Sequence, residues 1–86
     1  MHFTGAIVKE QGVTFAVVTV KKHVVENQWE ADEALLGFQP IFPGLPIVLV
    51  AQDHHGRPVY RGRQDIARFL ASVPMHRIPW RKYSVQ

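Results

Sequence analysis

The segment from Pro43 to Val73 constrains the fold of this 86-residue chain more than any other part. Its first half contains a short, continuous apolar run, Ile47–Ala51, which predicts a buried strand. After a polar turn, Arg57–Arg61 returns as a second strand. Pro58 cannot donate a backbone hydrogen bond to a neighbouring strand, so we expect this second strand at the edge of the sheet.

The second half of the segment has the pattern of an amphipathic helix. Gly62 breaks the preceding strand, and Pro74 ends the helix because the residue before a proline is disfavoured in helical geometry. Apolar residues recur at intervals of three and four and predict one buried face, formed by Ile66, Ala67, Phe69, Leu70 and Val73. Arg63, Gln64 and Arg68 are expected to stay exposed.

The first twenty residues predict an antiparallel hairpin. Two β-branched, apolar segments, Ala6–Glu10 and Val13–Val20, are separated by Gln11-Gly12, where the glycine can adopt the positive φ of a tight turn. In the second segment both alternating faces are apolar. This pattern is typical of a strand covered on both sides, so we expect that strand in the centre of the sheet.

A first helix is predicted from about Gln28 to Leu36. Asn27 is a suitable N-cap, with Glu30 at the reciprocal position of a capping box, and Gly37 is a suitable C-terminal stop. One helix face carries the apolar residues Ala31, Ala34, Leu35 and Phe38. Trp29, near the helix start, is expected to cover the edge of the core.

Together these elements predict one α+β domain over residues 1–86, in the order ββαββα. A mixed sheet of about four strands would pack against two helices, with the core in residues 1–73. The remaining residues, 74–86, form a basic, aromatic tail. Its apolar side chains favour docking on the same domain or on another subunit, through Ile78, Trp80 and Tyr83.

Composition excludes several classes of function. The chain has no cysteine, which rules out disulfides, thiolate metal sites and dithiol redox chemistry. The longest apolar stretch, around Phe15–Val20, is far below the roughly 20 residues needed to span a bilayer, and the first residues lack the pattern of a signal peptide. These features predict a cytoplasmic protein without membrane contacts.

Charge is unevenly distributed along the chain. Residues 1–56 contain three lysines and six acidic residues, whereas residues 57–86 contain six arginines, one lysine and a single acidic residue, Asp65. The net charge of +3 therefore combines an acidic N-terminal part with a basic C-terminal third. This polarity suits an anionic partner or head-to-tail contacts between copies, and it also suits a simple solvated basic surface.

Candidate chemistry is sparse. Asp53, His54 and His55 lie in the polar turn and are the most enzyme-like cluster, because adjacent Asp and His side chains can act as acid and base near neutral pH. No nucleophile accompanies them in a recognisable motif. The five histidines lack the spacing of a metal site, and no glycine-rich phosphate loop occurs. We therefore expect no metal and no cofactor.

The order of elements from Phe15 to Leu70 resembles the C-terminal half of a thioredoxin-like domain. The matching segments are FAVVTV, QWEADEALL, Gly44-Leu45-Pro46, IVLVA, PVYRG and RQDIARFL. By this resemblance, Pro46 would correspond to the cis-proline that borders the substrate site of that family. The strand and helix that carry the family's Cys-x-x-Cys are absent, so the resemblance does not extend to oxidoreductase activity.

The leading functional hypothesis is a non-enzymatic interaction or assembly module that forms a homodimer. Its contacts would use the tail segment Ile78–Tyr83 and the edge strand Pro58–Arg61, whose free backbone groups can pair with a partner strand. The alternative is nucleic-acid binding by the basic C-terminal third, and a third hypothesis is an enzyme that uses the Asp53 turn. The candidate partner-binding residues are Tyr60, Arg61, Arg63, Arg68, Arg77, Trp80, Arg81 and Tyr83.

Overall fold

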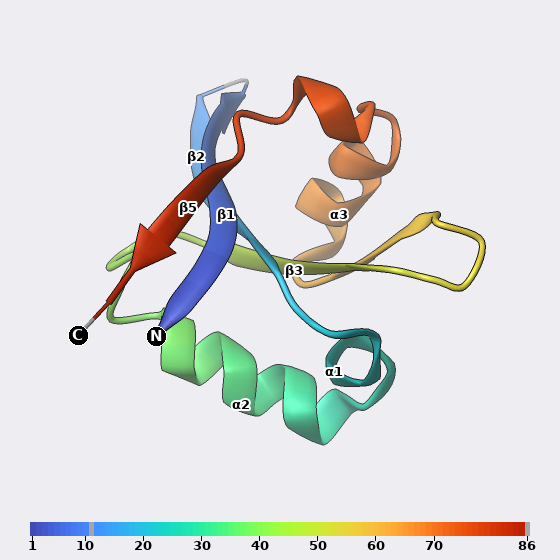
Figure 1. Cartoon of the computed structure of the whole chain (residues 1–86). Helices are drawn as coiled ribbons and strands as arrows, with labels where there is room; N and C mark the ends of the chain where they lie inside the picture. Colours follow the sequence, from blue (N-terminus) through green and yellow to red (C-terminus); the bar gives the residue numbers. More distant parts are fainter. Residues whose placement is uncertain (11, 86) are drawn as a thin grey trace.

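The chain folds into a mixed β-sheet with helices on both faces (Figure 1). The computed structural model describes residues 1–10 and 12–85, and within them five strands form one sheet in the order β4-β3-β2-β1-β5. The strands are β1 (His2–Glu10), β2 (Val13–Thr19), β3 (Ile47–Gln52), β4 (Pro58–Arg61) and β5 (Arg81–Ser84). The helices are α1 (Lys22–Glu26), α2 (Gln28–Phe38), α3 (Gln64–Ala71) and the 3₁₀ turn η1 (Met75–Arg77). The predicted α+β class is confirmed.

β2 occupies the centre of the sheet, as its two apolar faces predicted. It pairs antiparallel with β1 and parallel with β3, and β3 pairs antiparallel with the edge strand β4. Every residue from Phe15 to Val18 is buried, as is every residue from Ile47 to Ala51. One chain therefore covers both faces of its two central strands.

Alternate residues of the central strands enter two separate cores. One core lies under α3 and contains Phe15, Val17, Val48 and Val50 together with Ile66, Leu70 and Ile78. The other lies under α1 and α2 and contains Ala16, Val18, Ile47 and Leu49 together with Val25, Ala31 and Phe42. The period-two alternation of side chains along each strand produces this division.

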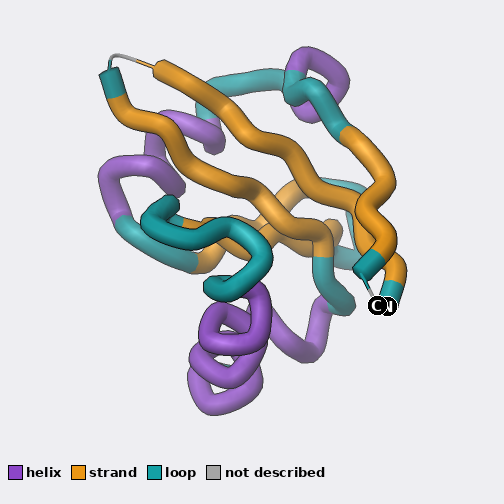
Figure 2. Tube along the Cα trace, turned by 90° about the vertical axis from the view of Figure 1, so that its left-hand side faces the viewer, coloured by secondary structure: helices purple, strands orange, loops and turns teal. Residues whose placement is uncertain are grey.

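The tail supplies a fifth strand, which the sequence pattern did not predict. β5 pairs antiparallel with the first half of β1, in a register that places Tyr83 opposite Phe3 and Lys82 opposite Thr4. The backbone N–H and C=O groups of Met1 and Val85 also bond to each other, so the chain ends lie side by side (Figure 2). The tail was expected to dock on its own domain or on another subunit. In the structure it docks on its own domain, through β5.

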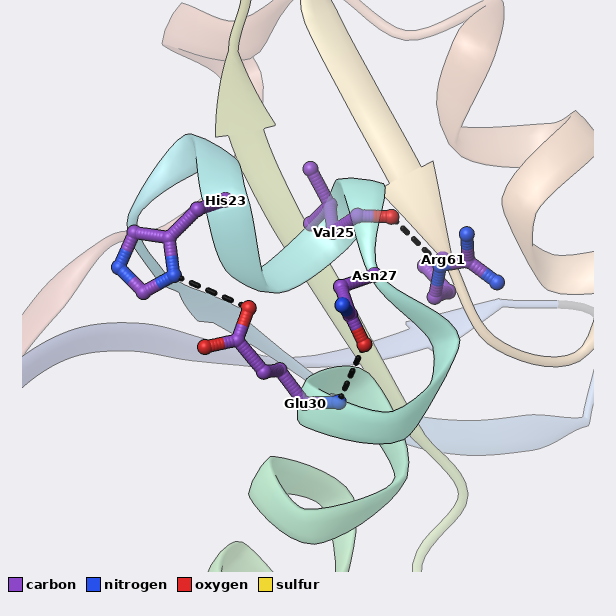
Figure 3. Close-up of polar contacts among 5 residues, drawn as sticks. All are labelled: His23, Val25, Asn27, Glu30 and Arg61. Carbon is purple, nitrogen blue, oxygen red and sulfur yellow. Dashed lines mark hydrogen bonds and ion pairs between the residues drawn. The ribbon is translucent and has the colours of Figure 1, made fainter.

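In the region of α1 and α2, one local prediction is confirmed and others differ from the structure. Residues 22–26, for which the sequence pattern predicts no helix, form the short helix α1. Asn27 caps α2 as predicted, because its Oδ1 accepts a hydrogen bond from the backbone N–H of Glu30 at 3.1 Å (Figure 3). The Glu30 carboxylate lies 3.2 Å from Nδ1 of His23. Gly37 does not end the helix, which continues to Phe38.

Two turn predictions concern glycine and proline. Gly12 has a φ of +80°, as expected for the hairpin turn, while its neighbour Gln11 lies outside the described residues. The cis-proline expectation is wrong, because the Leu45–Pro46 bond is trans, like all peptide bonds in the described ranges. Gly62 is required by a close approach, since a Cβ there would lie 2.9 Å from the carbonyl oxygen of Ile47.

Candidate binding surfaces

The turn that contains Asp53, His54 and His55 is built by hydrogen bonds to the aspartate. Asp53 Oδ1 accepts from the backbone N–H groups of His55 at 2.8 Å and Arg57 at 2.9 Å. The bond from Arg57 is the main cause that lowers the pKa of Asp53, so this carboxyl is ionised at neutral pH. Both imidazoles are exposed, with ring centroids 4.0 Å apart. The geometry assigns Asp53 a structural role in the turn.

The other histidines are scattered over the fold. His2 lies on β1, His23 on α1 and His76 in η1. Within residues 1–10 and 12–85, no group of three or more histidine and acidic side chains is arranged to hold a metal ion. The same residues contain no helix long and apolar enough to cross a membrane.

The basic residues of the C-terminal third do not act as one group. Two of them are paired within the domain, and the others lie in separate parts of the fold. Arg61 donates from Nε to the carbonyl oxygen of Val25 at the end of α1, at 2.6 Å (Figure 3). Arg63 forms two 2.8 Å hydrogen bonds with the carboxylate of Asp65. The other basic side chains are exposed and spread over the fold, with Arg57 in the turn before β4, Arg68 on α3, Arg77 in η1, and Arg81 and Lys82 on β5.

The aromatic residues proposed for partner contacts are partly occupied inside the domain. Tyr83 stacks on Phe3 with ring centroids 5.0 Å apart and also contacts Phe42 edge-on. The Tyr60 hydroxyl lies 3.3 Å from Sδ of Met75, and burial raises the pKa of this tyrosine. Trp80 donates from Nε1 to the carbonyl oxygen of Met75 at 2.9 Å.

Trp80 also lines a groove at the carboxyl ends of the parallel strands β2 and β3. The groove has a volume of about 420 Å³ and is lined by Thr4, Thr19, Val50, Gln52, Met75 and Trp80, with Val20 and Ala51. We call it the Trp80 groove. α3 and η1 lie together on one side of the sheet, away from the chain termini (Figure 1). Binding sites of open α/β sheets commonly lie at the carboxyl ends of parallel strands.

A second hollow adjoins the Trp80 groove. It has a volume of about 430 Å³, shares Thr4 with the groove and is otherwise lined by residues of β1 and β5, including His2 and Lys82. Because Lys82 is paired with Thr4 and His2 with Ser84, these side chains lie on the same face of the sheet as Thr4. The ionisable side chains lining the two hollows are only those of His2, Lys82 and Tyr83, among the residues that the structure describes.

The outer side of α2 carries a second surface, and it corrects the expectation for Trp29. This side chain does not cover the core; it is 75% exposed, and Leu36 is 76% exposed. The two positions are seven residues apart and therefore lie within about 20° of each other around the helix, with an axial spacing of about 10.5 Å. They point away from Ala31 and Phe38, which face the core.

Two carboxylates accompany these apolar side chains. Asp32 and Glu33 are exposed on the turn between Trp29 and Leu36. Among the described residues, neither carboxylate lies within ion-pair distance of a basic side chain. We call Trp29, Asp32, Glu33 and Leu36 the α2 stripe. The sequence contained a signal for it, because Trp29 and Leu36 share a helical face opposite the predicted apolar face.

Comparisons with known proteins add no further identification. No family model matches the chain, and no match was found among curated proteins or solved structures. The resemblance to the C-terminal half of a thioredoxin-like domain therefore stays a prediction.

Proposed function

We propose that this protein is a non-enzymatic interaction module that binds a basic amphipathic helix of a partner protein through the α2 stripe. The observation that carries the proposal is the exposure of Trp29 and Leu36 on one helix face. Leaving two large apolar side chains in water forgoes their burial energy, about 1.5 kcal/mol or more for each. A partner that covers both side chains recovers this energy.

The shape of the stripe favours a helix as the partner element. The axial spacing of about 10.5 Å between Trp29 and Leu36 matches apolar residues seven positions apart on another helix. Asp32 and Glu33 then lie beside the contact and select lysine or arginine on the partner. Tryptophan is among the residue types that most often dominate binding energy in protein interfaces.

A second copy of the chain is a weaker occupant of the same face. Antiparallel pairing of two α2 helices would place Trp29 of each copy near Leu36 of the other. The same arrangement brings Asp32 and Glu33 of both copies together, and like charges in contact oppose association at neutral pH. Homodimerisation stays a proposal for this protein, and sedimentation at neutral pH measures it directly.

The experiment uses two synthetic helical peptides as probes. Both carry leucines at positions i, i+3 and i+7, and they differ only in lysine or glutamate on the flanks. Replacing Trp80 by phenylalanine makes Trp29 the single tryptophan, because the chain has two. We expect the lysine peptide to bind and to shift Trp29 emission to shorter wavelength, and the glutamate peptide not to bind.

Variants of the α2 stripe give the decisive comparison. Isothermal titration with the lysine peptide is expected to show that W29A weakens binding by roughly thirtyfold, since interface hot spots contribute about 2 kcal/mol or more. The control is Ile7→Ala, an exposed apolar residue on β1. Equal binding of both peptides, or equal losses in W29A and I7A, contradicts the proposal.

A further inference from the structure

The Trp80 groove combines features that the α2 stripe lacks and that point to a small ligand. Its lining combines the aromatic Trp80 and apolar residues such as Val50 with three polar residues, Thr4, Thr19 and Gln52. The side chain of Thr19 bridges the strands by donating its hydroxyl to the carbonyl oxygen of Thr4 at 2.9 Å. A mostly apolar hollow with a few polar groups is the usual composition of a small-molecule site.

The charge in the adjoining hollow, which shares Thr4 with the groove, favours a ligand of negative sign. Lys82 and Ser84 alternate along β5 and face the same side of the sheet as Trp80, which precedes β5 and packs against the core under α3. Lys82 is exposed opposite Thr4, and His2 is exposed beyond it. Across the part of the chain that the structure describes, no aspartate or glutamate lines either hollow. The site is therefore complementary to an anion.

We propose that the Trp80 groove binds a nucleotide, with the base against the Trp80 indole and the phosphate at Lys82. A nucleobase is flat, so it suits an aromatic wall, and its edge carries both donors and acceptors. The Gln52 amide can satisfy both kinds of group, because it has an acceptor oxygen and two donor hydrogens. The phosphate supplies the negative charge that Lys82 and His2 favour.

Two sources can supply this chemistry, a free nucleotide and a nucleotide within a single strand. The groove itself has room for one base, and the exposed Arg77 lies in η1, three residues before Trp80. A strand that continues past the groove would reach this additional cation. A free nucleotide would use Lys82 and His2 alone.

The test follows the fluorescence of Trp80 in the full chain carrying Trp29→Phe. The replaced tryptophan is exposed, so the fold is retained, and Trp80 becomes the only indole. The probe is adenosine 5′-monophosphate at low ionic strength, with adenosine and inorganic phosphate as partial ligands. We expect saturable quenching by the nucleotide, weaker binding of adenosine and weaker competition by phosphate alone.

Two lysine variants in this background test the position of the phosphate. Lys82→Ala is expected to weaken nucleotide binding about three- to fivefold, the range of an exposed charge pair. The matched control, Lys9→Ala, removes the same charge from the opposite face of the sheet at the other end of β1 and is expected to leave binding unchanged. Gln52→Ala, at an exposed position, is expected to weaken nucleotide binding without changing competition by phosphate.

An octamer of adenylate distinguishes the two sources. Tighter binding of the octamer than of the monophosphate, with a steeper salt dependence, identifies a single strand as the source. Equal affinity per nucleotide identifies the free nucleotide. The proposal is overturned by an absence of saturable quenching, by equal losses in the two lysine variants, or by adenosine or phosphate alone binding as tightly as the nucleotide.

Discussion

α2 and α3 pack on opposite faces of the same sheet, yet they differ in how much of their apolar surface they bury. α3 places Ile66 and Leu70 in the core, and no large apolar side chain of this helix is exposed. α2 buries one side and leaves Trp29 and Leu36 in water on the other. The contrast separates apolar residues that hold the fold together from apolar residues that are free to contact a partner.

The largest expected effect is the difference in stability loss between alanine variants of two leucines, one on each helix. Leu70 is 1% exposed and Leu36 is 76% exposed. Leu70→Ala is expected to lower the free energy of unfolding by about 2 to 5 kcal/mol, because a buried leucine leaves a cavity. Leu36→Ala is expected to change it by about 0.5 kcal/mol or less. Urea unfolding measures both. Similar losses in the two variants would mean that α2 buries Leu36 in the folded protein.

Two glycines provide the next comparison, at the start of α3 and near the end of α2. Gly62→Ala is expected to destabilise the protein by about 1 to 3 kcal/mol, since its Cβ would press on the backbone of β3. A Cβ added at Gly37 would point into open space, with no neighbouring atom within 4 Å, and Gly37→Ala is expected to stabilise by about 0.5 to 1 kcal/mol. Thermal unfolding of the two variants measures these opposite shifts, and shifts of the same sign would contradict the assigned environments.

The parts of the fold that the sequence predicted are those with strong local patterns. The apolar faces of β2 predicted its central position, and Pro58 predicted the edge position of β4. β5 was missed because its four residues, RKYS, include exposed charges and only one large apolar side chain, Tyr83. Its partner is the start of β1, about eighty residues earlier, and no local pattern encodes such a pairing.

The candidate surfaces were harder to predict than the fold. Trp80 was identified from its type, but the groove beside it depends on strands brought together from distant parts of the sequence. The expectation that Trp29 covers the core edge, which rests on its position at the helix start, is wrong, because this side chain is 75% exposed. The spacing between Trp29 and Leu36 contained the relevant information, since both positions lie opposite the buried face of α2. In α2, the spacing of residues around the helix predicts which side chains are exposed better than the residue type does.

The smallest expected effect is a difference in how the stability of the two helix starts depends on pH. α2 starts with the neutral cap Asn27, whereas the first turn of α3 contains Asp65, whose pKa is lowered chiefly by the hydrogen bonds from Arg63. A lowered folded pKa means that ionised Asp65 stabilises the fold above about pH 4, and that this contribution is lost as the pH falls through the folded pKa. Asp65→Asn should therefore be less stable than the parent protein at neutral pH and equal to it in acid.

Asn27→Ala is the matched control at the start of α2. It is expected to cost about 1 kcal/mol at every pH, because the amide that accepts from Glu30 does not titrate. Urea unfolding of both variants between neutral and acid pH measures the two differences. A constant difference for Asp65→Asn would show that its charge does not contribute, and a difference for Asn27→Ala that vanishes in acid would show that the α2 cap depends on the nearby Glu30 carboxylate. The expected results would separate the two helix starts by pH, because the Asp65 contribution at α3 depends on its charge whereas the Asn27 cap of α2 accepts its bond without a charge.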